Sequence, residues 1–334
     1  MTRTLRIATR GSALALAQTG MIAAELTRLT GVEVQITVVT TEGDTSRASL
    51  ASIGGTGVFA SALRAALVAG EADLVVHSLK DLPTAPYPGL RLAAVPSRED
   101  PRDALISQGG LTLDELPKGC RIGTGSPRRV AQLLSLRPDA TVVDIRGNVD
   151  TRLAKVSSGE LDAVVLAAAG LTRLGRLDAV TEFFDLALWP TAPGQGALAL
   201  EAREEDSIPE LVMIDDADTR LSITAERAVL AALEAGCTAP IGANATVTRP
   251  AFSSSAFELT LTAAVYSADG EEELGSSQSV RLGGALAEAV AGAGLADPSA
   301  AFAAQVEAAE ALGRAVAAQL LDDGAAELAE LGAR

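Results

Sequence analysis

The chain has 334 residues, of which 48% are hydrophobic, 21% are charged and only 3% are aromatic. This length suffices for two or three domains, and the scarcity of aromatics requires cores built from Ala, Val, Leu and Ile. The formal net charge of −16 argues against a nucleic-acid binder, because such proteins need a basic face to neutralise phosphates.

The first two hundred residues alternate between strand-like and helix-like segments. In the first half of this region the patterns predict strands at 5–8, 32–39, 72–77 and 91–95, and helices at 12–29 and 59–69. In the second half they predict strands at 103–107, 121–124, 141–145 and 162–166, and helices beginning near Ser126 and at 149–157. The alternation predicts two parallel sheets flanked by helices, with ligands bound at the carboxyl ends of the strands.

The remaining third has a different character. Residues 201–218 are acidic and irregular, which predicts a linker. A helix is expected at 223–234, and antiparallel strands are expected at 243–247 and 259–266. Residues 283–298 are rich in Ala and Gly and are expected to form an insertion, and a final helix is expected from about Ala300.

Arginines recur beside turn glycines at the predicted helix starts. In 124–129 a strand leads through Gly125 to Ser126, Pro127, Arg128 and Arg129, so backbone N–H groups face outward at a helix start. Two arginines in a first helical turn oppose the helix dipole, and they therefore indicate an anionic ligand. The alternative is that Ser-Pro is simply a common helix start.

Two further segments repeat this design. Arg146 ends a strand and Arg152 lies in the next helix, while Arg10 and Ser12 flank the first strand–helix turn. Three such sites favour a ligand with several carboxylates, which arginine binds through paired hydrogen bonds. For Arg152 a solvated helix surface is the alternative. Residues 54–57 lack the Lys-Ser/Thr ending of a phosphate loop, which weakens a nucleotide hypothesis.

Two more positions stand out as candidate site residues. Lys80 and Asp81 follow a buried strand just before a proline, a common place for site residues, although Asp81 could instead cap a turn or pair with Lys80. Cys237 follows Gly236 and precedes Pro240, which is typical of a thiol displayed on a loop; an inert thiol is the alternative. With two cysteines and one histidine, no zinc spacing is present, so we expect no metal.

Several features indicate the compartment. The N-terminus has no apolar signal-peptide core, and no apolar run is long enough to cross a membrane. Two cysteines do not make a disulfide framework. We therefore expect a cytoplasmic protein without a membrane partner.

Taken together, these segments resemble the hydroxymethylbilane synthase (porphobilinogen deaminase) family. The similarity extends over about residues 5–245 and is loose beyond about 266. The matching stretches, in family order, are 7–12, 76–84, 98–103, 123–129, 146–152, 193–197, 226–228 and 236–242.

This resemblance implies a transferase of porphyrin and haem biosynthesis. Such an enzyme condenses four porphobilinogen molecules head to tail into hydroxymethylbilane and releases ammonia. The resemblance also implies a dipyrromethane cofactor held by a thioether to Cys237, a monomer, and a catalytic role for Asp81. By position, Lys80, Thr124, Ser126, Arg128 and Arg129 would bind the cofactor, and Arg10, Ser12, Arg146, Arg152 and Arg173 would bind substrate.

The implied fold is α/β, with two domains like type II periplasmic binding proteins and a smaller α+β C-terminal domain. Domain 1 would comprise 1–98 with 195–217, domain 2 would comprise 99–194, and domain 3 would comprise 218–334 and carry the cysteine loop. This chain departs from the family at Ser52 and Thr56, where lysines are frequent, and at Glu42, where arginine is frequent. The main alternative function is a two-lobed anion-binding or sensing module, and a nucleotide-dependent transferase is a weaker one.

Overall fold

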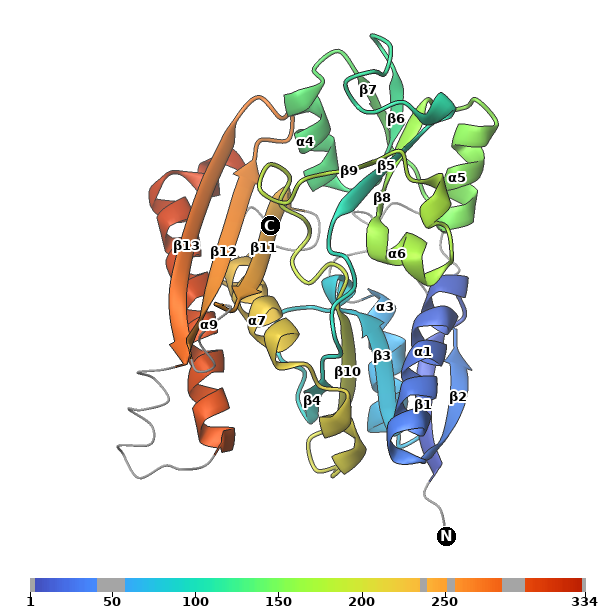
Figure 1. The fold of residues 1–334 in the computed structure, drawn as a ribbon, viewed down its shortest axis with the longest axis vertical. Helices are drawn as coiled ribbons and strands as arrows, with labels where there is room; N and C mark the ends of the chain where they lie inside the picture. Colours follow the sequence, from blue (N-terminus) through green and yellow to red (C-terminus); the bar gives the residue numbers. More distant parts are fainter. Residues whose placement is uncertain (1–3, 41–57, 235–238, 251–255, 284–297, 332–334) are drawn as a thin grey trace.

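The computed structural model describes residues 4–40, 58–234, 239–250, 256–283 and 298–331. Cys237, the departures at 42, 52 and 56, and nearly all of 283–298 lie outside these residues. Figure 1 shows three units: one below, one above, and a C-terminal unit along the side of both. Within the described ranges, no helix combines the length and apolar character needed to cross a bilayer.

The first unit is a five-stranded sheet with helices α1 and α3. Its strand order is β2-β1-β3-β10-β4, with β1 parallel to β2 and β3, and β10 antiparallel to β3 and β4. Side chains of β1 and β3, such as Ile7 and Leu74, pack against Ile22 and Leu26 of α1. The elements are β1 (Thr4–Arg10), α1 (Ala13–Thr30), β2 (Glu33–Val39), α3 (Val58–Val68), β3 (Leu74–Ser78), the 3-10 turn η1 (Leu79–Asp81), β4 (Leu90–Ala94) and β10 (Leu198–Arg203).

The second unit repeats this plan, with strand order β7-β6-β8-β5-β9. Strand β6 is parallel to β7 and β8, whereas β5 is antiparallel to β8 and β9. The elements are β5 (Asp103–Ser107), η2 (Gln108–Gly110), β6 (Arg121–Gly123), α4 (Pro127–Leu136), β7 (Thr141–Val143), α5 (Val149–Ser157), β8 (Ala163–Ala167), α6 (Ala168–Arg173), η3 (Leu177–Ala179) and β9 (Glu182–Phe183).

The prediction of purely parallel sheets was wrong, because both sheets are mixed. In each sheet the antiparallel strand, β5 or β10, is the first strand formed after the chain crosses from the other unit. A strand that enters a sheet from the other unit is not connected by a βαβ crossover, so it can run antiparallel to its neighbours.

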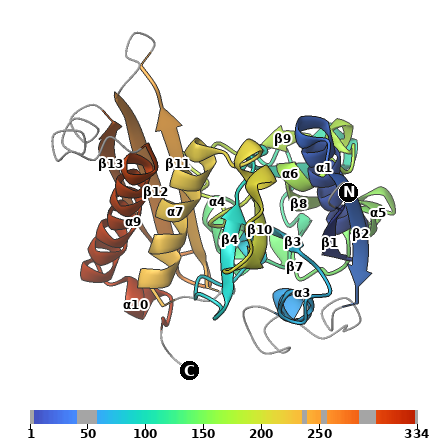
Figure 2. The same ribbon diagram turned by 90° about the horizontal axis from the view of Figure 1, so that it is seen from below.

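The C-terminal unit is an antiparallel sheet, β11-β12-β13, with helices on one face (Figure 2). Its core contains Val229, Leu261 and Val316, from α7, β12 and α9. The bounds are α7 (Ala217–Ala232), β11 (Ile241–Thr248), β12 (Ala256–Tyr266), β13 (Glu273–Gly283), α9 (Pro298–Asp322) and α10 (Ala325–Leu328). The fold class expected from the sequence, two α/β units with a smaller α+β unit, is therefore confirmed.

The prediction of a linker over 201–218 was also wrong. Residues 201–203 belong to β10, a short 3-10 helix η4 spans Pro209–Met213, and α7 begins at Ala217 after the N-cap Asp216. Glu201 is only 4% exposed, and it pairs with Arg64 at 2.8 Å and with His77 at 2.9 Å. The acidic composition was misleading because this carboxylate is buried against Arg64 and His77 and does not face water.

Candidate functional site

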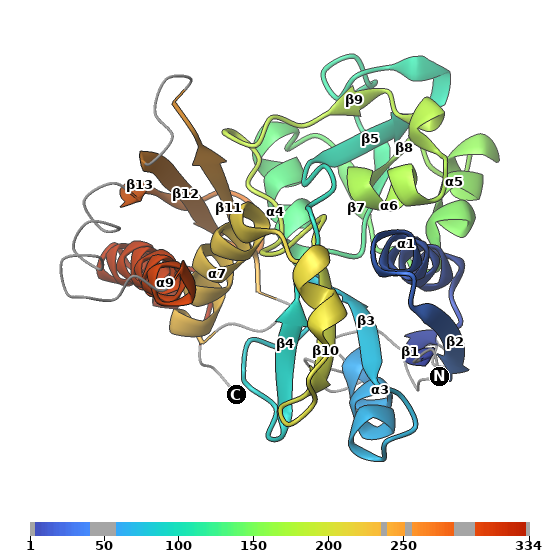
Figure 3. The ribbon, with the colours of Figure 1, turned by 60° about the horizontal axis from the view of Figure 1, so that its bottom comes forward.

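A cleft of about 990 Å³ lies between the first and second units. Its walls come from the starts of four helices, each of which follows a strand or a strand-end turn. These are α1 and α6, which lie next to each other in Figure 3, together with α4 and α5. Helix starts present backbone N–H groups and the positive end of the helix dipole. The arrangement therefore favours a negatively charged ligand.

The side chains of the cleft reinforce this preference. Among the described residues, five cations and one carboxylate, Asp150, line it; the cations are Arg10, Lys80, Arg129, Arg146 and Arg152. Burial, with the nearby Arg129 and Arg146, lowers the pKa of Arg152. Burial and the neighbouring Arg129 lower the pKa of Lys80 to about 8. An anion that binds among these crowded positive groups lowers their electrostatic free energy.

The local sequence explains the shape of the helix starts. Ser12 caps α1 by accepting a hydrogen bond from the Ala15 amide at 3.3 Å, and Asn148 caps α5 by accepting one from Thr151 at 2.8 Å. Helix α4 begins with Pro127 after Ser126, and the Ser126 side chain makes no capping hydrogen bond. The predicted strand–turn–helix form at these three places is confirmed.

Beneath the cleft lies a buried carboxylate that the sequence analysis had not singled out. Asp103 is fully buried at the start of β5 and accepts four hydrogen bonds. The donors are Arg129 at 2.6 Å, Gln195 at 2.7 Å, Trp189 at 2.8 Å and Arg128 at 2.9 Å. Burial alone would raise the pKa of Asp103, but Arg129 and Arg128 outweigh it and hold the pKa far below its usual range.

Asp103 changes how the two adjacent arginines are understood. Their unfavourable interaction with the α4 dipole is reduced, because the Asp103 carboxylate neutralises one of their two charges. Arg129 lines the cleft, whereas Arg128 lies behind it and is 3% exposed. The Nε atoms of both arginines are buried without a hydrogen-bond partner among the described residues. Buried donors in this state indicate that an acceptor belongs nearby.

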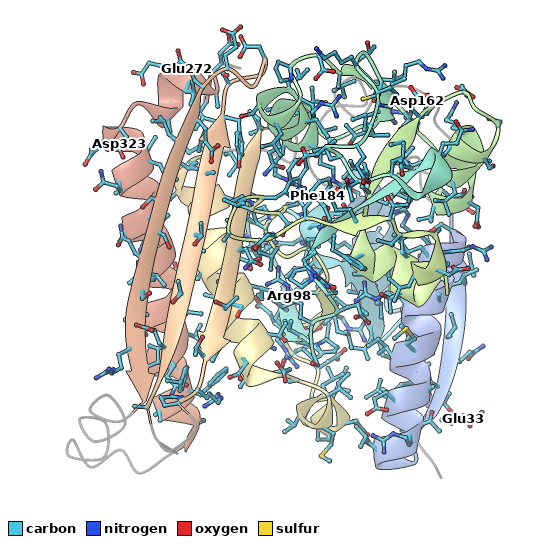
Figure 4. The ribbon with its side chains drawn as sticks, turned by 45° about the horizontal axis from the view of Figure 1, so that its top comes forward. Glu33, Arg98, Asp162, Phe184, Glu272 and Asp323 are labelled. Atoms are coloured by element: carbon cyan, nitrogen blue, oxygen red, sulfur yellow. The ribbon has the colours of Figure 1, made fainter. Side chains whose placement is uncertain are left out.

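Gln195, just before β10, contacts residues of both the first and the second unit beside the cleft. Gln195 accepts a hydrogen bond from Lys80 at 3.2 Å and donates to Asp103. Its backbone oxygen accepts from Arg98 at 2.7 Å, and Arg98 pairs with the buried Glu226 of α7 at 2.6 Å. Figure 4 shows Arg98 in the middle of the molecule. Sequence reasoning included Gln195 and Arg98 in matching stretches but assigned them no role.

The other predicted site residues lie around the cleft. Asp81 is half-buried in η1, directly after Lys80. Thr124 is fully buried and accepts a hydrogen bond from the Ser126 amide at 3.3 Å, and Arg173 donates to the Gly196 carbonyl at 2.6 Å. None of these three residues lines the cleft in the described part of the chain. Cys237, which lies between α7 and β11 in the chain, is outside the described residues.

Comparisons with known proteins bear on both α/β units and on the C-terminal unit. A family model described as "Porphobilinogen deaminase, dipyromethane cofactor binding domain" matches residues 5–210, and one described as "Porphobilinogen deaminase, C-terminal domain" matches 220–322. A protein named porphobilinogen deaminase from Leifsonia xyli subsp. xyli is 55% identical, covering 98% of this chain and 94% of its own length. One from Cutibacterium acnes is 51% identical, covering 98% of both chains. Among solved structures, a putative methionine-binding lipoprotein from Bacillus subtilis matches 65% of this chain and 92% of its own, with 14% identity and a TM-score of 0.40.

Proposed function

The chain belongs to the porphobilinogen deaminase family, and we propose that the cationic side chains of its central cleft bind the carboxylates of porphobilinogen and of the growing pyrrole chain. It is a transferase of tetrapyrrole biosynthesis that condenses porphobilinogen into hydroxymethylbilane, and its cofactor is dipyrromethane. The observation that carries the binding proposal is the gathering of five cations and four helix starts around one cleft. No separate observation favours a sensing module.

The residues present fit the cofactor. We propose that Lys80 and Arg129, which line the cleft, hold its carboxylates directly and that Arg128 assists from behind the cleft, because both arginine Nε atoms are buried donors without an acceptor among the described residues. Thr124 and Ser126 shape the α4 start that faces it. When bound, dipyrromethane supplies the pyrrole carbon to which the first porphobilinogen is joined. The tether is proposed to be a thioether to Cys237.

The substrate carboxylates are proposed to bind to the remaining cationic residues of the cleft. Arg10 and Ser12 stand at the start of α1, while Arg146 and Arg152 stand at the start of α5, so an anion between them is contacted from both units. Arg173 is proposed to act from beside the cleft, where its Nε is buried without a partner among the described residues.

Asp81 is proposed to be the catalytic carboxylate. Loss of ammonia from porphobilinogen leaves a cationic pyrrole, which a nearby carboxylate stabilises electrostatically and can relieve of a proton. Asp81 is held next to the cleft-lining Lys80 in η1, and Arg227 of α7 fixes the residues that follow by donating to the carbonyls of Leu82 at 2.9 Å and Pro83 at 2.7 Å. The side chain is half-buried, which strengthens its interaction with a cation compared with bulk water.

The experiment that tests this proposal is intact-mass spectrometry combined with an assay of product formation from porphobilinogen. The purified protein is expected to be heavier than its sequence by one dipyrromethane unit and to release hydroxymethylbilane. The two cysteines of the chain provide a matched pair. Cys237→Ser should lose the added mass and the activity, whereas Cys120→Ala, at a buried thiol in the second unit, should keep both. An active Cys237→Ser protein would refute the tether.

The finer expectations are likewise proposals. We propose a monomer that acts in the cytoplasm, with domain boundaries at 1–98 with 195–217, 99–194 and 218–334. The pairing of β10 with β3 and β4, and the start of α7 at Ala217, support these boundaries. Size-exclusion chromatography with light scattering tests the monomer, and a dimer mass would contradict it.

A further inference from the structure

A buried polar chain connects Arg128 to the C-terminal unit. Arg128 donates from Nη2 to Asp103 at 2.9 Å and from Nη1 to the Gln132 side-chain oxygen at 2.5 Å and the Pro190 carbonyl at 3.1 Å. Gln132, one helical turn further along α4, donates in turn to Pro190 and to the hydroxyl of Tyr266, both at 3.0 Å. Because both of its N–H groups have acceptors, the Gln132 amide is held in the orientation that presents its oxygen to Arg128.

Tyr266 is fixed firmly at the end of β12. It is 2% exposed and packs with Ala131 and Ala264. Burial raises the pKa of Tyr266 to about 12, so the hydroxyl stays protonated while it accepts the hydrogen bond from Gln132.

The backbone beside Tyr266 also docks on α4. A Cβ on Gly270, in the turn between β12 and β13, would lie 2.3 Å from the Ala131 carbonyl oxygen and 2.9 Å from the Ser135 nitrogen. Gly270 has φ of +73°, so a side chain there is disfavoured by conformation as well. The β12–β13 turn therefore sits directly against the helix that carries the two arginines.

The position of Arg128 affects the charge available in the cleft. Asp103 receives Arg128 on one carboxylate oxygen and Arg129 on the other, so one of two positive charges remains uncompensated, and Arg129 is the arginine that lines the cleft. If Arg128 leaves Asp103, the carboxylate is neutralised by Arg129 alone, and less of that positive charge is available to a ligand carboxylate.

We propose that Tyr266 and Gln132 are positioning residues that hold Arg128 on Asp103 and thereby keep the charge of Arg129 available for substrate carboxylates. The inference rests on the proposed binding function. According to this inference, the binding of carboxylates by Arg129 of the second unit depends on the packing of the C-terminal unit against α4.

The test uses Tyr266→Phe, which removes the hydroxyl and keeps the ring. The matched control is Thr262→Val, on the same strand, which removes a hydroxyl paired with Ser277 at 2.9 Å away from α4. Losing one buried hydrogen bond to the network should raise the KM for porphobilinogen about fivefold while kcat changes little. It should also flatten the fall of kcat/KM with added salt. Thr262→Val should behave as wild type in both respects.

A second variant guards against a general loss of folding. Gln132→Met keeps the length of the side chain and removes the acceptor for Arg128, so it should show the same kinetic change, and the double variant should be no worse than Gln132→Met alone. Crystal structures of the variants should show Arg128 beyond hydrogen-bond distance from Asp103. Unchanged KM, or additive defects, or an undisturbed Arg128–Asp103 pair would each overturn the inference. A wild-type protein that forms no product would instead refute the proposed function.

Discussion

Replacing Asp103 with asparagine tests the foundation of the site. Asparagine keeps one acceptor oxygen and places an NH2 group where the second carboxylate oxygen accepted two of the four hydrogen bonds. Two buried guanidinium groups, on Arg128 and Arg129, then lose their counter-charge. Breaking a buried pair in this way costs about 3–5 kcal/mol. We therefore expect a marked loss of stability together with poor cofactor loading.

Urea unfolding at pH 7, followed by the fluorescence of Trp189, measures this loss. Trp189 is the only tryptophan of the chain, is 1% exposed and stacks on Phe184 with ring centroids 4.2 Å apart, so it reports on the unit that contains Asp103. For an m-value of about 2 kcal/mol/M, the midpoint should fall by about 2 M. The control Asp139→Asn, at an exposed carboxylate paired with Arg137, should scarcely change the midpoint.

The pH dependence follows from the sign of the pKa shift. The folded pKa of Asp103 lies below the unfolded value of about 3.9, so its stabilisation is complete above that value and is lost only as the pH falls below it. The difference between wild type and Asp103→Asn should therefore be the same at pH 6 and pH 8, and it should shrink in acid. A variant as stable as Asp139→Asn at pH 7 would refute the reasoning.

Three further predictions concern the cleft. Asp81→Asn should fold and carry the cofactor yet lose about two orders of magnitude or more in kcat; near-normal turnover would rule out its catalytic role. In protein without cofactor, the pKa of Lys80 of about 8 lies below the unfolded value of about 10.4. The unfolded state then binds more protons between these values, so stability should rise with pH there, and Lys80→Met should abolish that rise in urea midpoints; equal pH slopes would contradict it. Arg146→Leu should raise the KM about tenfold at low salt and less at high salt, because a charged contact with the substrate is lost. Arg121→Leu, at an exposed arginine paired with Asp162, should leave the KM unchanged. Equal effects of the two variants would argue against the placement of Arg146 in the cleft.

The order and kind of most elements followed from local pattern. The predicted helix at 149–157 coincides with α5, and Ser12 caps α1 as expected, because capping residues and apolar periodicity act over a few residues. Arg10, Arg146 and Arg152 were predicted to bind one ligand because each belongs to a strand–turn–helix segment. They come from two different sheets, and the structure brings their side chains to one cleft between the two units.

Other elements of the fold depend on contacts between residues far apart in the sequence, and local sequence patterns do not predict these contacts. The acidic segment 201–218 was predicted to be a linker, yet its first residues belong to β10, which lies between β3 and β4 and buries Glu201 against Arg64, 137 positions away. The strand β13 was not predicted, because exposed and partly buried positions alternate along nearly its whole length with few large apolar side chains.

The family motifs, the alternation of elements and the arginine-rich helix starts could all be recognised in the sequence, because each is encoded in a short stretch of residues. Contacts between distant residues determine which arginine lines the cleft and which lies behind it. Arg128 and Arg129 are adjacent in the chain, but Asp103, 25 and 26 positions before them, and Tyr266, 134 positions after Gln132, fix their different roles. A buried charge is defined by the partner that folding brings to it, and the spacing of residues along the chain does not specify that partner.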